Sequence, residues 1–149
     1  MTIYTQRHQI TDILKRPNWT QENVSAMIAD CKAGEIARAA DNDDTFDAPA
    51  FDAWARETLW QQANVDVGQY IYSHYDPGTQ ASFLSLHADP STPQQGKDAI
   101  ESVWAWIKSV MAYYYSVKNQ LLAGTVVKWD FIQFDATDPD VKLSDFMGQ

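Results

Sequence analysis

The chain has 149 residues, with 11 lysine and arginine residues against 20 aspartates and glutamates, a formal net charge of −9. This length fits a single domain with an adequate hydrophobic core. The acidic balance argues against a nucleic-acid partner, because DNA and RNA binders use basic side chains to displace counterions. No apolar run approaches the roughly 20 residues that cross a bilayer, so we expect no membrane insertion. The first ten residues also lack the apolar segment of a secretory signal peptide.

Aromatic residues are distributed unevenly along the chain. Residues 1–45 contain only Tyr4 and Trp19, whereas residues 46–149 contain the other 17. Large aromatic side chains dominate buried cores. We therefore predict an N-terminal arm and a weak helix over residues 1–45, joined at the acidic stretch 41–44 to a better-packed part over residues 46–149. Together the two parts are expected to form one compact domain.

In the N-terminal part, residues 2–14 fit either an extended arm or a short helix. Residues 20–40 are predicted to be helical, with a thin apolar edge that Gly34 interrupts. Because few apolar residues lie on this edge, we expect this helix to be weaker than those that follow.

Three further helices are predicted between residues 47 and 123. The first covers residues 47–75 and ends at Asp76-Pro77-Gly78, because proline removes a donor and glycine permits positive φ. A short helix follows over residues 79–86. The third covers residues 93–123, from the N-cap candidate Thr92 to Gly124, which can adopt a left-handed terminating conformation. We expect an antiparallel pair of long helices with the short helix between them.

After Gly124 the pattern changes. In the segment TVVKWDFIQF, Val127, Trp129 and Phe131 alternate with polar residues, which is the period-two pattern of a β-strand. A lone strand leaves its backbone groups unpaired. Its partner is expected to be either residues 3–10 or another polypeptide. The predicted fold class is thus mainly α, with a short C-terminal β-strand.

The helix over residues 93–123 carries more apolar surface than one packing partner would cover. One stripe runs from Ile100 to Leu121 at spacings of three and four residues, but further large side chains lie outside it. These residues and the two large aromatics of the predicted strand are predicted to contact other protein subunits: Trp106, Tyr113, Tyr115, Leu122, Trp129 and Phe131.

No residue pattern gives positive support for a metal or cofactor. Asp41, Asp43, Thr45 and Asp52 fall at spacings like those of a calcium loop, but the sixth position is Phe46 rather than the glycine of the sharp turn. We interpret the stretch as a solvated acidic hinge. Cys31 has no neighbours that indicate a catalytic thiol, and we interpret it as structural.

One arrangement could serve acid–base chemistry. His74 and His87 flank the predicted turn, and Asp76 and Asp89 each follow two residues later. The alternative is one buried histidine and one at a helix C-terminus, where imidazolium is favoured. Because no nucleophile or phosphate-binding motif is present, we expect no catalytic residues, no cofactor and no enzymatic activity.

The segments AWIKSVMAYYYSVKNQLLAG and VVKWDFIQFDATDP, preceded by HYDPGTQASFLSLHADPSTP, resemble small tail-fibre-associated proteins of tailed bacteriophages and prophages. The resemblance covers about residues 70–140. It implies a protein made in the bacterial cytoplasm that is either a tail, fibre or baseplate component located in the virion or an accessory that helps a fibre assemble. It also implies other protein subunits as partners, either further copies in a homo-oligomer or a fibre or baseplate protein.

Three functions follow as hypotheses. The first is a non-enzymatic structural or assembly protein of such a tail, in which the strand docks onto another subunit. The second is a tail-fibre assembly chaperone or stand-alone helical protein-binding module. The third is a small enzyme that uses His74 and His87 with the nearby Asp76 and Asp89.

Overall fold

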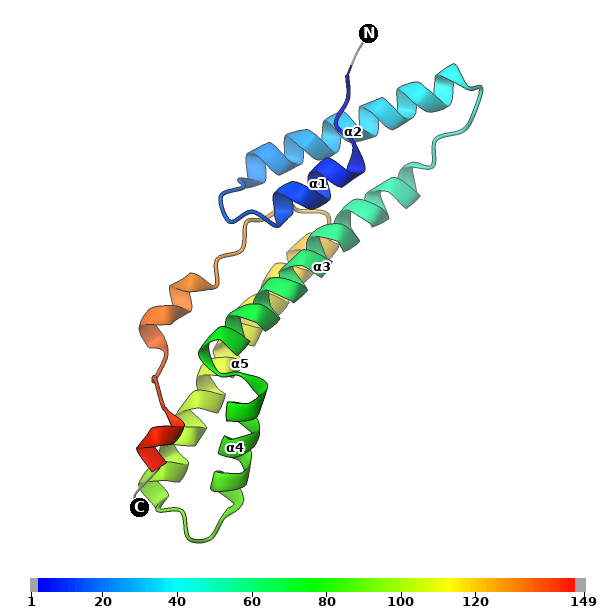
Figure 1. The fold of residues 1–149 in the computed structure, drawn as a ribbon. Coiled ribbons are helices and arrows are strands. Elements are labelled where there is room, and N and C mark those ends of the chain that lie inside the picture. The colour runs from blue at the N-terminus through cyan, green and yellow to red at the C-terminus, as the bar shows by residue number, and fades with distance from the viewer. Residues whose placement is uncertain (1–2, 147–149) are drawn as a thin grey trace. The chain divides into compact units, whose positions relative to one another are not determined.

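A computed structural model describes residues 3–146, and over this range the protein is mainly helical (Figure 1). The prediction of a mainly α protein is confirmed. The elements, in chain order, are α1 (Arg7–Leu14), α2 (Gln21–Asp41), α3 (Ala48–His74), α4 (Pro77–Ala88), α5 (Gln94–Leu122) and the 3-10 helices η1 (Ile132–Thr137) and η2 (Leu143–Phe146).

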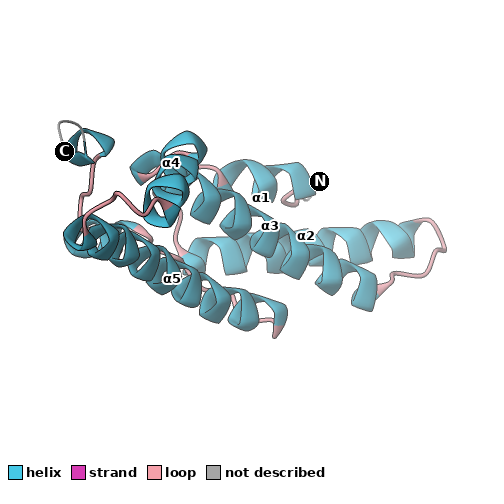
Figure 2. Ribbon diagram, turned by 90° about the horizontal axis from the view of Figure 1, so that it is seen from below, coloured by secondary structure: helices cyan, strands magenta, loops and turns pink. Residues whose placement is uncertain are grey.

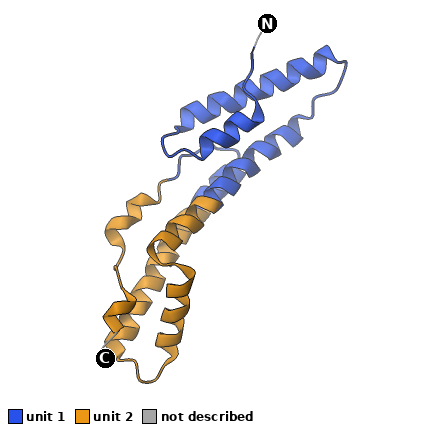
Figure 3. Cartoon of the chain, viewed as in Figure 1, with its two compact units in different colours: residues 1–64, 116–129 blue, residues 65–115, 130–149 orange. Residues whose placement is uncertain are grey.

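The chain forms two compact units that do not follow its order (Figure 3). Unit 1 comprises Met1–Asn64 and Ser116–Trp129, and unit 2 comprises Val65–Tyr115 and Asp130–Gln149. The division therefore falls within α3 and within α5, not at the acidic stretch near residue 45. Because long helices contribute residues to both units, the uneven aromatic content of the sequence does not locate this border.

Unit 1 is built on the packing of α1 against α2. Helix α2 begins where the side chain of Thr20 accepts a hydrogen bond from the backbone N–H of Asn23 at 3.1 Å, an N-cap that satisfies one free donor of the first turn. Ile10 and Leu14 of α1 are 1% and 2% exposed, and Val24 of α2 is fully buried. Of the two alternatives for residues 2–14, the short helix is observed over Arg7–Leu14, residues 3–6 are not helical, and residue 2 lies outside the described residues.

The chain before α1 crosses α2 at Gly34. A Cβ placed on Gly34 would lie 2.5 Å from the Cβ of Tyr4 and 2.6 Å from its Cγ. Atoms of real side chains do not approach so closely, so the absence of a side chain at position 34 allows this crossing. Gly34 thus contributes to the packing of unit 1, although the apolar pattern presents it only as an interruption.

We expect Gly34→Ala to lower the free energy of unfolding by about 1–3 kcal/mol, because Tyr4 must move away from the new methyl group. The matched control is Gly68→Ala in α3, where an added Cβ meets nothing within 4 Å. That variant is expected to be more stable by about 0.5–1 kcal/mol, the ordinary gain of alanine over glycine in a helix. Urea unfolding followed by circular dichroism measures both, and equal effects at the two positions would contradict the crossing.

Unit 2 is built around a cluster of aromatic side chains. Asp76 is the N-cap of α4: its side chain accepts the Thr79 N–H at 2.7 Å, and Pro77 occupies the first helical position. Phe83 of α4 is fully buried and lies 6.0 Å, between ring centroids, from both Tyr75 and Phe146. This cluster brings the end of α3, helix α4 and η2 together.

The predicted C-terminal β-strand is wrong, because no strand occurs within residues 3–146. The chain between α5 and η1 is a loop (Figure 2). Side chains take up backbone donors that a partner strand would have taken: Gln21 accepts the Lys128 N–H at 3.2 Å, and the Tyr113 hydroxyl accepts the Asp130 N–H at 3.0 Å. The alternation in sequence instead reflects individual burial of Trp129 and a few neighbouring residues.

Candidate functional site

The six predicted contact residues have different surroundings in the structure. Trp106, Trp129 and Phe131 are 4%, 5% and 6% exposed, so this chain itself buries them. Tyr113 is half-buried. Only Tyr115, 53% exposed, and Leu122, 43% exposed, retain large accessible surfaces.

In unit 1, Trp129 packs against the start of the chain. Its ring lies 5.0 Å from that of Trp19 in an edge-to-face arrangement. The neighbouring Lys128 places its ammonium group 4.0 Å from the Trp19 ring and donates to the carbonyl of Pro17 at 3.1 Å. Edge-to-face ring contacts and cation–π contacts both favour this packing beyond area burial.

In unit 2, the segment after residue 130 packs against Trp106 and Tyr113. Phe131 lies 5.6 Å from the ring of Tyr113 and 6.0 Å from that of Tyr70. The indole N–H of Trp106 donates to the carbonyl oxygen of Phe134 at 3.0 Å. Trp106, Tyr113 and Phe131 therefore have packing partners within the same chain.

The same segment places two carboxylates around a histidine. We define the His74 cluster as Tyr70, His74, Tyr75, Asp135 and Asp138. The His74 Nδ1 lies 2.6 Å from a carboxylate oxygen of Asp138, and its Nε2 lies 3.1 Å from one of Asp135. Tyr70 donates its hydroxyl hydrogen to Asp135 at 2.6 Å, and Tyr75 donates to Asp138. No ring nitrogen of His74 is left to act on a substrate.

The electrostatics of the cluster favour a charged Asp138 and neutral tyrosines. Burial and the hydrogen bond to Asp135 raise the pKa of Tyr70, and burial and the hydrogen bond to Asp138 raise that of Tyr75. Burial alone would raise the pKa of Asp138, but hydrogen bonds from Tyr75, the Asp140 N–H and His74 outweigh it and lower the pKa overall. The carboxylate of Asp138 is thus held as an acceptor.

The other residues of the acid–base hypothesis have separate, local partners. The Nε2 of His87 lies 3.1 Å from Glu101, and its ring lies 4.6 Å from Trp104. Asp76 caps α4, and Asp89 accepts the Ser91 N–H at 2.8 Å. The backbone N–H groups of Thr79 and Ser91 lower the pKa values of the two aspartates. Neither histidine is paired with the aspartate two residues after it.

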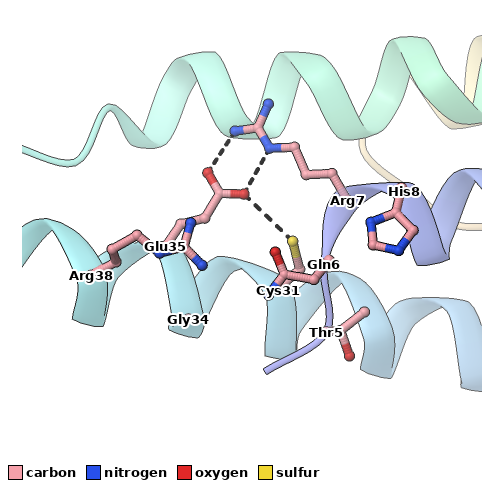
Figure 4. A pocket seen from close by; sticks show the side chains of 8 residues that line it. All are labelled: Thr5, Gln6, Arg7, His8, Cys31, Gly34, Glu35 and Arg38. Atoms are coloured by element: carbon pink, nitrogen blue, oxygen red, sulfur yellow. Dashed lines mark hydrogen bonds and ion pairs between the residues drawn. The ribbon is translucent and has the colours of Figure 1, made fainter. Parts of the chain in front are cut away.

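Unit 1 contains a polar pocket of about 310 Å³ between α1 and α2 (Figure 4). Arg7 donates from Nε and Nη2 to the two carboxylate oxygens of Glu35, each at 2.7 Å. The guanidinium carbon lies 4.6 Å from the Trp54 ring and 5.2 Å from the Phe51 ring. A paired guanidinium that also stacks on aromatic rings is a structural arrangement typical of arginine.

Cys31 lies beside this ion pair and is 1% exposed. Its thiol donates to Glu35 at 3.5 Å. Burial, with the hydrogen bond to Glu35, raises the pKa of Cys31 to about 11. Because the thiolate is the nucleophilic form, this environment opposes reactivity and agrees with the structural role expected for Cys31.

Sequence reasoning missed the partners of two of these groups. Asp135 lies in η1 and Asp138 directly follows it, but nothing local indicates His74 as their partner. Likewise no local pattern joins Arg7 to Glu35. Among residues 3–146, no group of three or more histidine, cysteine, aspartate or glutamate side chains is arranged to hold a metal ion.

Comparison of the chain with protein-family models, with curated proteins and with solved structures finds no match. Within the part of the chain that the structure describes, no helix combines the length and the apolar character required to cross a bilayer.

Proposed function

We propose that this chain is a non-enzymatic helical protein that acts by binding another protein, and that Tyr115 belongs to its contact surface. The observation that supports this is that Tyr115 stays 53% exposed in unit 2, where most other large aromatic side chains are covered. On α3 of the same unit, Val65 and Tyr72 are 48% and 54% exposed. They are seven residues apart and so share one helix face. Tyrosine is enriched where proteins meet.

The form of this function that we favour is a binding module or assembly chaperone that is monomeric until it meets its client. The support is that residues of the same chain pack against the large aromatic side chains: Trp19 packs on Trp129 in unit 1, and Tyr113 packs on Phe131 in unit 2. In a subunit that exchanges its C-terminal segment with a neighbour, Trp129 and Phe131 would instead pack against residues of the neighbouring chain.

The second candidate is a structural tail subunit that forms a homo-oligomer. Leu122 in unit 1 remains 43% exposed and supports it. For either candidate, the resemblance of residues 70–140 to tail-fibre-associated proteins supports a place in the assembly or the particle of a tailed bacteriophage.

We also propose that α3 and α5 are antiparallel, with Trp60 beside Lys118 in unit 1 and Tyr70 beside Trp106 in unit 2.

Two measurements test the proposal. Size-exclusion chromatography with light scattering is expected to give the mass of one chain, 16.9 kDa. Co-expression with the products of the neighbouring reading frames is expected to yield a stoichiometric complex. Tyr115→Glu should weaken this complex at least about tenfold, because it places a charge in an apolar contact.

The matched control is Ser109→Glu, which adds the same charge at another exposed position of α5 in unit 2 and should leave the complex intact. A stable homo-oligomer that Leu122→Glu dissociates would overturn the monomeric form in favour of the structural subunit. If the protein is monomeric and none of the neighbouring products binds it, the binding role itself is wrong.

A further inference from the structure

One imidazole, that of His74, contacts two carboxylates of the segment that covers part of unit 2. Both ring nitrogens of His74 face carboxylates of this segment, Asp138 at 2.6 Å and Asp135 at 3.1 Å. We propose that His74 is a proton-dependent clasp: in its imidazolium form it holds residues 130–141 on α3 and α5, and loss of its proton loosens that segment.

The hydrogen-bond acceptors around His74 match only the imidazolium form of its ring. An ionised carboxylate only accepts hydrogen bonds, whereas a neutral imidazole has one donor and one acceptor. The carboxylate oxygen of Asp135 that faces Nε2 also accepts from Tyr70, and Asp138 accepts from Tyr75 and from the Asp140 N–H. Two acceptors therefore face the two nitrogens of one ring. Only imidazolium, which donates from both, satisfies them together.

The remaining titratable groups around His74 do not duplicate its role. Tyr70, on the same helix, and Tyr75, the residue after that helix, have raised pKa values and stay neutral at higher pH, for the reasons given above. Asp130 and Asp140 add negative charge near these tyrosines. On α5, His74 faces Trp106, whose ring lies 5.0 Å away and carries no titratable group.

The side chain of His74 is 20% exposed, so protons can reach it, whereas that of Asp138 is 12% exposed. Imidazole is the side chain that ordinarily changes charge between about pH 5 and about pH 8. Loss of the ring proton at higher pH removes a donor and leaves one carboxylate facing a ring lone pair. The segment would then uncover Trp106 and Tyr113. A role for this change in partner binding rests on the proposed function, but the clasp itself does not.

Hydrogen exchange measured by mass spectrometry or NMR tests the clasp. The reporting amides are those of Phe134, Asp138 and Val141, which donate to Phe131, Asp135 and the Tyr75 hydroxyl. After correction for the intrinsic pH dependence of exchange, their protection is expected to fall about tenfold from about pH 5 to about pH 8, the effect of losing one charge-assisted hydrogen bond. Protection in the middle of α5 should not change.

Two variants should abolish this pH dependence. His74→Gln cannot change its charge. Asp135→Asn, at a side chain that is 52% exposed, offers an N–H to a neutral ring and so removes the need for the second proton. The matched control is His87→Gln, which removes the histidine that contacts Glu101 and Trp104 and should leave the dependence unchanged.

Far-UV circular dichroism establishes that each variant keeps its helices. If His74→Gln loses helical content, Asp135→Asn decides the result. Equal protection of the wild-type segment at both pH values, or a pH dependence that persists in the folded variants, would overturn the proposal. These measurements use the chain without a partner. They can therefore contradict the proton-dependent role of His74 without contradicting the binding function, and the binding function can be wrong while the role of His74 is confirmed.

Discussion

Trp106→Ala is expected to destabilise the protein by about 3–5 kcal/mol, the range for truncating a large buried aromatic side chain. The Trp106 side chain is 4% exposed, and its ring lies within 5.0 to 5.8 Å of His74, Tyr70 and Tyr75. Its indole N–H also holds the carbonyl of Phe134. Truncation leaves a cavity and removes this donor. Urea unfolding monitored at 222 nm, a wavelength that reports helix content, measures the loss.

Trp104→Ala is the matched control for Trp106. Trp104 is on the same helix, two residues away, but is only half-buried and contacts His87 rather than the His74 cluster. Its truncation should cost less than half as much. Trp106→Phe should be intermediate, since it restores most of the ring but not the N–H. A loss from Trp106→Ala no larger than that from Trp104→Ala would show that Trp106 is not part of a packed core.

Trp129→Ala is expected to destabilise the protein by a comparable amount, about 3–5 kcal/mol. In unit 1 its ring meets Trp19 edge to face, and Trp19 is itself 4% exposed and covered by Lys128. Truncation removes both the buried area and the ring pair. Urea unfolding again provides the measurement.

A double-mutant cycle separates the ring pair from simple burial. Trp19→Ala and Trp129→Ala together should cost less than the sum of the two single changes, with a coupling free energy of about 0.5–1.5 kcal/mol. Val127→Ala, at a half-buried neighbour on the same loop, should show no coupling to Trp19. Full additivity of the tryptophan pair would contradict the contact that replaces the predicted strand.

The helices were predictable from the sequence because their signals are local. The predicted helix over residues 93–123 corresponds to Gln94–Leu122, and that over residues 20–40 to Gln21–Asp41. Gly124 ends α5 with a φ of 96° and donates to the Leu121 carbonyl, as its left-handed preference predicts. Apolar periodicity and terminal residues act within a few positions of one another, so a single sequence contains them.

What could not be predicted depends on residues far apart in the chain. His74 meets its carboxylates 61 and 64 positions further on, and Arg7 meets Glu35 28 positions away. Alternation in the C-terminal segment indicates which side chains are buried, but not whether a strand or a side chain such as Gln21 receives the backbone donors. The same uncertainty made Trp106 and Phe131 look unpartnered, because the segment that covers them cannot be placed from its own sequence.

The ion pair between Arg7 and Glu35 in the polar pocket restricts the substitutions that positions 7, 35 and 54 can accept. The planar guanidinium of Arg7 connects three helices. It belongs to α1, pairs with Glu35 of α2 and lies against the ring of Trp54 of α3. Lysine would supply the charge without the plane, and glutamine a plane without the charge. Genes descended from a common ancestor should therefore change positions 7, 35 and 54 in concert or leave all three alone, so that an alignment would link them statistically despite their separation.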